Sequence, residues 1–356
     1  GGAGAMAETA PPAEAFFATP AIDAVRLAPS GEHLGALVAA GSGRQLAVMP
    51  VSRSRARVLS IPAAVRDYRW VTDERLVLAI GASDRAPGLA AVNRDGSGYR
   101  VLAAPAGDPA RREGATLLDI LPRQPADVLV VDDRRQAGAP DVYRVNVFTG
   151  ERALVARNPG RVLRWWTDRL GRVRLSLAWL HGSQGLRYVL RHRFGGDTGW
   201  QRLHEARLGG PFISPLAFDA DNRHLFVASS VGRDTTAVQR YDTVTMTLGE
   251  VVHARPDADV SAMEPAPGGG VASVRYEAQT PVQVYPGGEE PAGWEWLNEQ
   301  LPGLEHRVVS RSRDGERAVI LARGDREPGR FYLFEREPRR LEPLGARLPW
   351  LEGRLG

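Results

Sequence analysis

The stretch "DVYRVNVFTGERALV" (141–155) contains the pattern from which the fold of the whole chain can be worked out. Apolar and polar residues alternate on both sides of a Thr-Gly-Glu break, and such alternation is typical of half-buried β-strands. A glycine-containing break between two alternating runs predicts a β-hairpin. A similar run, "AVQRYDTVTMTLGEVV" (237–252), follows later in the chain, so the hairpin is a candidate repeat.

Another hairpin pattern, two apolar runs around a small polar turn, precedes each of these segments. It occurs seven times, at 26–38, 68–80, 118–131, 163–179, 215–229, 262–276 and 308–322. A third apolar run follows each occurrence, at 44–51, 88–96, 141–151, 186–193, 237–244, 281–286 and 329–337. A short fourth run generally closes the unit, as at 99–105 and 152–157.

Four strands repeating at roughly 40 to 50 residues are typical of β-propeller blades. One blade cannot bury both of its faces, so neighbouring blades must stack around an axis. The sequence therefore predicts an all-β, seven-bladed β-propeller of four-stranded antiparallel blades. Residues 20–350 are expected to form this single domain, after an N-terminal tail (1–19) and before the start of a linker (351–356).

One segment, "PAGWEWLNEQLPG" (291–303), departs from the strand pattern. It has a proline near its start, a glycine at its end, and apolar residues at helical spacing, namely Trp294, Leu297 and Leu301. We expect a short helix inserted in the sixth blade. Its aromatic side chains are expected to pack against that blade rather than to form a ligand box.

The composition excludes several classes of function. There is no cysteine, so disulfides and thiolate metal sites are excluded. All 46 basic residues are arginine, which suits phosphate binding but is better explained by codon bias in a GC-rich genome. The formal net charge is only +4, with the arginines interleaved among 42 acidic residues, so nucleic acid is not an expected partner. No run approaches the ~18 apolar residues of a membrane span.

The N-terminal residues fit two interpretations. Ala5-Met6-Ala7 matches the A-x-A pattern of a signal-peptidase site, which would make residues 1–7 the end of an export signal. A vector-derived leader of similar composition fits equally well. The first interpretation underlies the expectation that the protein is periplasmic or secreted rather than cytoplasmic.

Five segments carry a resemblance to a known family: "DYRWVTDERLVLAI" (67–80), "PDVYRVNVFTGERALVARNPGRV" (140–162), "GRDTTAVQRYD" (232–242), "SVRYE" (273–277) and "VVSRSRDGERAVI" (308–320). Together they resemble the N-terminal propeller of prolyl oligopeptidase-family serine peptidases, of the bacterial dipeptidyl/acylaminoacyl-peptidase-like kind. The resemblance extends from Phe16 to Trp350. It implies a propeller that covers an α/β-hydrolase domain of the same protein and admits peptide substrates but not folded proteins. It also implies that the chain ends about where the hydrolase domain would begin.

The chemistry of such a hydrolase is absent from this sequence. A serine nucleophile would need a G-x-S-x-G elbow, and the chain contains none. The seven histidines never form an H-E-x-x-H or another close ligand pair, and "DADN" (219–222) lacks the glycine and glutamate of a calcium loop. We therefore expect no catalytic residue, no metal and no cofactor in this chain.

Two charged patches are candidate substrate-binding residues. "GRDT" (232–235) places Arg233 and Asp234 at the mouth of a strand, and "RYE" (275–277) places Arg275 beside Glu277. These charges could line the central pore or its lower face and steer peptide termini. The alternative, which the sequence favours, is that they form ion pairs between adjacent blades.

Three functions remain open at this point. The first is a propeller that controls access to, and docks on, the hydrolase domain of a serine peptidase. The second is a stand-alone periplasmic propeller that binds a protein or peptide partner. The third is a propeller enzyme with an unrecognised pore site. The reading frame beyond residue 356 discriminates between the first two.

Overall fold

The computed structural model describes residues 18–351, except 42, 53–54, 83–86, 106–113, 184, 196–198, 267, 279–281 and 287–292. The candidate export site Ala5-Met6-Ala7 lies outside this range. The chain divides into two compact units. The first contains residues 1–84, 89–101 and 291–356, and the second contains 85–88 and 102–290. The expectation of a single domain over 20–350 stays a prediction.

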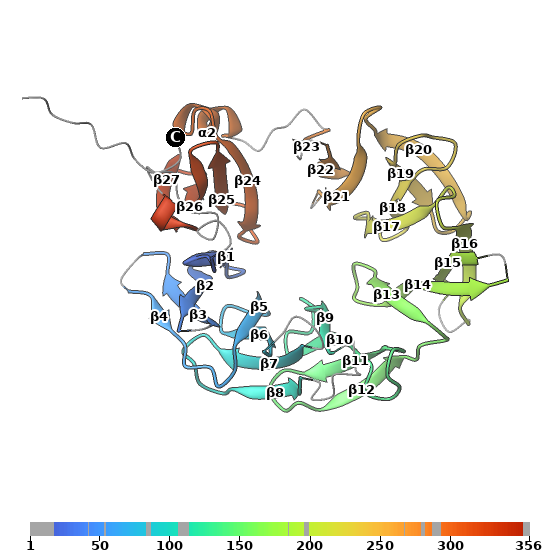
Figure 1. The fold of residues 1–356 in the computed structure, drawn as a ribbon, viewed down its shortest axis with the longest axis horizontal. Helices are drawn as coiled ribbons and strands as arrows, with labels where there is room; N and C mark the ends of the chain where they lie inside the picture. The colour runs from blue at the N-terminus through green and yellow to red at the C-terminus, as the bar shows by residue number, and fades with distance from the viewer. Residues whose placement is uncertain are drawn as a thin grey trace, which may run out of the picture. The chain divides into compact units, whose positions relative to one another are not determined.

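The fold is the all-β, seven-bladed propeller that the repeats predict. The first three sheets are β1 (Ile22–Leu27), β2 (His33–Ala40), β3 (Gly43–Pro50) and β4 (Arg57–Val58); β5 (Val65–Trp70), β6 (Arg75–Ile80), β7 (Gly88–Asn93) and β8 (Arg100–Ala103); β9 (Thr116–Asp119), β10 (Asp127–Asp132), β11 (Asp141–Asn146) and β12 (Arg152–Ala156). Within each sheet the strands are paired in chain order, as Figure 1 shows.

The remaining sheets repeat this arrangement. They are β13 (Val162–Thr167), β14 (Val173–Gly182), β15 (Gly185–His192) and β16 (Gln201–Arg207); β17 (Ile213–Phe218), β18 (His224–Ser229), β19 (Ala237–Asp242) and β20 (Thr247–His253); β21 (Asp259–Pro265), β22 (Val271–Glu277) and β23 (Val282–Val284); β24 (Glu305–Arg311), β25 (Arg317–Gly324), β26 (Glu327–Glu335) and β27 (Arg340–Ala346). In the described residues the sixth sheet has three strands, one fewer than the repeat predicts.

The hairpin quoted first is confirmed. It consists of β11 and β12, which pair antiparallel, with Val145 opposite Arg152. Asn146 ends β11, and its Oδ1 accepts hydrogen bonds from the backbone N–H groups of Phe148 and Thr149, both at 2.9 Å. Asp242 makes the same turn in the related hairpin, where its Oδ1 accepts from Val244 N at 2.8 Å. Side chains that cap their own turns in this way explain why the two sequences look alike.

The hydrophobic core lies between neighbouring blades. In the second unit, Leu175 and Leu190 of the fourth blade pack in one cluster with Phe218 and Leu225 of the fifth. In the first unit, Leu27 of the first blade packs with Leu321 of the seventh, as part of the cluster Val25, Leu27, Leu34, Val319, Leu321, Phe331 and Leu333. Within each unit, neighbouring blades therefore bury apolar faces against each other, as the propeller argument requires.

The first and seventh blades meet in the first unit without sharing a strand. Their contact, called the seam here, adds side-chain and backbone hydrogen bonds to this apolar cluster: Leu27 N donates to Ser310 Oγ at 2.9 Å, and Arg313 N donates to Pro29 O at 2.8 Å. Arg317 Nη1 also donates to Glu32 Oε1 at 2.6 Å. Each terminal blade is thus complete by itself.

The expected helix exists, but its placement differs from the prediction. It is α2 (Trp294–Gln300), and the start of the predicted range, 291–292, lies outside the described residues. The Trp296 ring lies 6.0 Å from the ring of Phe334 on β26, so the helix packs on the seventh blade instead of the sixth. Leu297, only 1% exposed, is buried on the same helix. No helix in the described part is long and apolar enough to cross a membrane.

Candidate functional site

Arg233 and Asp234 lie in the exposed turn between β18 and β19 of the fifth blade. Arg233 N donates to Ser230 O at 3.1 Å and closes this turn. The turn leads to Thr236, whose backbone N–H donates to Asp259 Oδ1 at 2.7 Å, at the start of the sixth blade. The two predicted residues therefore lie at an end of the fifth blade that is hydrogen-bonded to the sixth.

Arg275 and Glu277 lie on β22 of the sixth blade, on either side of the buried Tyr276. Burial raises the pKa of Tyr276 to about 12, although the positive charges of Arg255 and Arg233 oppose this shift. Strand alternation points Arg275 and Glu277 away from the side on which Tyr276 is buried. The structure brings the two predicted patches to neighbouring blades.

The alternative interpretation of Arg233, Asp234, Arg275 and Glu277 is that they form ion pairs between adjacent blades. Among the described residues, none of the four side chains has an opposite charge within ion-pair distance, so the favoured blade-to-blade ion pairs are not seen. Blade-to-blade charge pairing uses other residues, such as Arg317 with Glu32. The substrate-binding role of the four residues stays a prediction.

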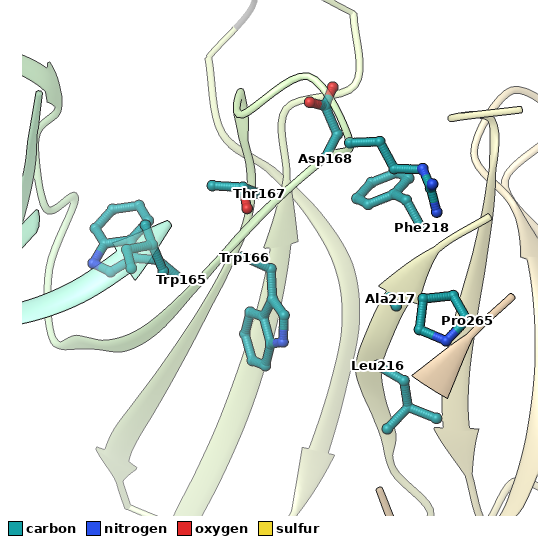
Figure 2. Close-up of a pocket in the computed structure, with 10 residues that line it drawn as sticks. Trp165, Trp166, Thr167, Asp168, Leu216, Ala217, Phe218 and Pro265 are labelled. Atoms are coloured by element: carbon teal, nitrogen blue, oxygen red, sulfur yellow. The ribbon is translucent and has the colours of Figure 1, made fainter. Parts of the chain in front are cut away.

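A pocket of about 270 Å³ lies elsewhere in the second unit (Figure 2). It is formed at the carboxyl ends of the first strands of four successive blades, β9, β13, β17 and β21. Its lining residues are Leu118, Trp165, Trp166, Thr167, Asp168, Arg169, Leu216, Ala217, Phe218 and Pro265. A concave, mostly apolar site with a few polar groups is the usual form of a binding pocket.

The two adjacent tryptophans serve different blades. Successive side chains of a strand point to opposite faces, so Trp165 and Trp166 diverge, as Figure 2 shows. Trp165 is buried against the third blade, and its Nε1 donates to Pro140 O at 3.2 Å. Trp166 is half-buried on the side of the fifth blade, with the Arg164 guanidinium 5.1 Å from its ring centre. Trp166 therefore supplies an aromatic wall that remains partly accessible.

Asp168 organises the turn at one edge of the pocket. Its side chain is fully buried and forms an ion pair with Arg174, at 3.1 Å between Oδ2 and Nη1. Its Oδ1 accepts from the backbone N–H groups of Leu170 and Arg172 at 2.9 and 3.0 Å. Asn222 of the fifth blade donates from Nδ2 to Asp168 Oδ2 at 3.2 Å. Both carboxylate oxygens are thus engaged, and Asp168 is a structural residue.

Of the two other polar residues that line the pocket, Thr167 uses its side chain within the fold and Arg169 does not. The Thr167 hydroxyl donates to Asp119 Oδ2 at 2.7 Å and so links the fourth blade to the third. The backbone N–H of Arg169 donates to Asn222 Oδ1 at 2.8 Å. The Arg169 guanidinium has no hydrogen-bond or ion-pair partner among the described residues. It is the lining group that remains available for a ligand's charge.

The segment that carries Trp166 and Arg169 is strongly basic. Between residues 161 and 174 there are five arginines and one acidic residue, Asp168, an excess equal to the formal net charge of +4 of the entire chain. The general interleaving of charges therefore has a local exception here. This arginine density and the Trp-Trp pair were the sequence signals that could have identified the pocket.

Comparisons with known proteins agree with the fold. No family model matches the chain. The chain is 25% identical over 353 residues to dipeptidyl aminopeptidase BIII of Pseudoxanthomonas mexicana. The aligned region covers 96% of this chain but only 49% of that enzyme. The chain thus spans about half the length of the curated relative that it matches.

Solved structures give the same result. A prolyl endopeptidase matches with a TM-score of 0.61 and 14% identity, over 95% of this chain and 52% of that one. A puromycin hydrolase matches with a TM-score of 0.59 and 16% identity, over 93% of this chain and 54% of that one. The chain is therefore a homologue of about half of a dipeptidyl aminopeptidase, and its fold is that of the N-terminal β-propeller of the prolyl oligopeptidase family.

Proposed function

We propose that this chain is the propeller domain that docks on, and controls access to, the α/β-hydrolase domain of a prolyl oligopeptidase-family serine peptidase. One observation carries the proposal: the match to a dipeptidyl aminopeptidase covers nearly all of this chain but only 49% of that enzyme. The part of the relative that is not matched is large enough to hold a separate catalytic domain. The lack of any G-x-S-x-G elbow here agrees with a nucleophile located elsewhere.

The role that follows is selection rather than bond cleavage. A propeller contributes charged and apolar side chains that can attract, orient or exclude a peptide before it reaches a nucleophile. Such residues change which substrates are cleaved without taking part in acyl transfer. Peptides are the proposed substrates, because the relative that matches over the full chain is named as an aminopeptidase.

An active-site-directed fluorophosphonate label tests the assignment. The purified 356-residue chain should remain unlabelled and should not hydrolyse a panel of chromogenic dipeptides. The protein encoded by the complete reading frame should be labelled once per chain and should hydrolyse at least one dipeptide of the panel. Stoichiometric labelling of the 356-residue chain would overturn the proposal, as would a reading frame that encodes no hydrolase domain.

Access control needs a separate comparison. The complete protein should cleave a short peptide but should leave the same sequence intact when it is presented on the surface loop of a folded protein. Equal rates for the two substrates would mean that the propeller does not restrict entry.

A further inference from the structure

We propose that the pocket formed by β9, β13, β17 and β21 binds the free C-terminal end of a peptide whose last side chain is apolar. In this assignment Arg169 pairs with the terminal carboxylate, and Trp166 contacts the last side chain. The inference rests on the proposed function, because it supposes that the propeller meets peptides. It concerns a site that is separate from the four charged residues predicted from the sequence.

The walls of the pocket favour an apolar group. Trp166, Leu216 and Pro265 face the space shown in Figure 2, and Ala217 and Phe218 of β17 also line it. A volume of about 270 Å³ would hold about nine water molecules at roughly 30 Å³ each. Displacing poorly held water from apolar walls favours binding. The space suits one bulky side chain rather than a long segment of peptide.

The charge of the pocket favours an anion. Thr167 and Asp168 direct their polar atoms to Asp119, Arg174 and Asn222, so neither offers a group to a ligand. Arg169 is left as the available charge, in a segment with four excess positive charges. Arginine binds carboxylates through two parallel N–H···O hydrogen bonds, which provides orientation as well as energy.

The backbone of Arg169 is held by the fold, while its side chain is exposed. Its backbone N–H is held by Asn222 Oδ1, and the preceding residue is held by the ion pair with Arg174. The same amide of Asn222 therefore restrains two consecutive residues of the turn. A guanidinium on a restrained backbone loses less freedom on binding than one on a free loop.

Among anionic ligands, a peptide C-terminus combines both features. A small inorganic anion would use the guanidinium but leave the aromatic wall without a contact. A peptide N-terminus would bring a positive charge into a positively charged segment, which is unfavourable. An apolar C-terminal residue carries its carboxylate and its side chain on the same Cα, so one residue can present the first to Arg169 and the second to Trp166.

Calorimetric titration of the 356-residue chain tests this assignment with three probes. They are N-acetyl-Gly-Gly-Phe with a free carboxylate, the same peptide as its C-terminal amide, and N-acetyl-Gly-Gly-Gly with a free carboxylate. The first probe should bind at least tenfold more tightly than either of the others. Arg169→Gln should abolish the preference for the acid over the amide, and Trp166→Ala should abolish the preference for phenylalanine over glycine.

Arg172→Gln is the matched control. It removes the same charge from the same turn, but Arg172 does not line the pocket, so the preference for the acid should persist. Equal binding of acid and amide by the wild-type chain, or no binding of the first probe at millimolar concentration, would overturn the inference. If the Arg169 and Arg172 variants lost the preference for the acid equally, general electrostatic attraction would explain that preference. This result would also overturn the inference. None of these outcomes bears on fluorophosphonate labelling, so the proposed function is tested independently.

Discussion

Asn222 and Asp168 face each other across two blades, with Asn222 Nδ2 donating to Asp168 Oδ2 at 3.2 Å. The other end of the Asn222 amide accepts the backbone N–H of Arg169 at 2.8 Å. Asn222 itself has a φ of 54°, in the left-handed region where asparagine is among the few tolerated side chains. One residue thus combines a turn conformation with a two-point clamp on the next blade.

Substitution of Asn222 should separate these two contributions. Asn222→Gly retains the left-handed turn but removes both hydrogen bonds. We therefore expect the free energy of unfolding to fall by about 2 kcal/mol. Asn222→Ala should lower the free energy of unfolding by about 1 kcal/mol more, because alanine is disfavoured in the left-handed region. The free energy of unfolding from urea titrations provides the measurement. A glycine variant as stable as the wild type would show that the clamp contributes nothing.

The related turns of the third and fifth blades allow a second comparison. Gly150 has a φ of 78°, and Met246 occupies the equivalent position with a φ of 59°. Gly150→Ala should lower the free energy of unfolding by about 1 kcal/mol. Met246→Gly should change it by less than about 0.5 kcal/mol, because relief of the strained backbone is offset by the entropy of glycine. Urea midpoints of both variants provide the measurement. Equal changes in stability for Gly150→Ala and Met246→Gly would contradict this account.

Much of the fold could be predicted from the sequence, because local patterns determine the strands and turns. Alternation in 141–155 and the capping residues Asn146 and Asp242 act within a few positions of the chain. The partner of α2 was predicted wrongly, since a helix pattern shows which face is apolar but not which blade covers it. Phe334, which packs on Trp296, is distant in sequence and belongs to the following blade.

A buried carboxylate in the third blade should make stability depend on pH. Asp141 accepts hydrogen bonds from Arg135 Nε and Nη2 at 2.5 and 2.9 Å, and from Asn158 N at 2.7 Å. Burial alone would raise the pKa of Asp141, but these donors hold the pKa below its ordinary value. Asp141→Asn should therefore cost about 2 kcal/mol at neutral pH.

The difference between wild type and Asp141→Asn should shrink in acid. A carboxylate with a lowered pKa stabilises the fold above its unfolded pKa of about 4, and this contribution is lost as the pH falls below that value. Urea titrations at pH 7 and pH 3 provide the comparison. A difference that stays constant, or grows, between the two pH values would contradict the assigned role of Asp141.

A hydroxyl links the fourth and fifth blades. The backbone N–H of Ile213 donates to Tyr188 Oη at 2.6 Å, and burial raises the pKa of Tyr188 to about 12. Tyr188→Phe leaves a buried N–H without a partner, so we expect a loss of about 1–3 kcal/mol in the free energy of unfolding. Tyr99→Phe serves as the control and should have little effect, since no described residue bonds to its hydroxyl. Equal stability of the two variants would contradict the role of this link.

The candidate site was harder to predict than the fold. The sequence predicts a site at Arg233, Asp234, Arg275 and Glu277 because opposite charges lie close together in the chain. The pocket instead combines residues of four blades, and its polar groups become distinguishable only when their partners are known. Asp168 lines the pocket, but both of its oxygens are engaged within the fold.

The seam between the first and seventh blades has a consequence for the order of folding. Leu27 and Ser310 are 283 positions apart in the chain, and Glu32 and Arg317 are 285 apart, whereas the strands within a blade are joined by short turns. Contacts between such distant residues form late, since a long loop must be closed before they are made. Weakening the seam, for example with Arg317→Gln, should therefore accelerate unfolding much more than it slows folding. The last blade-to-blade contact to form would then set the kinetic lifetime of the native protein.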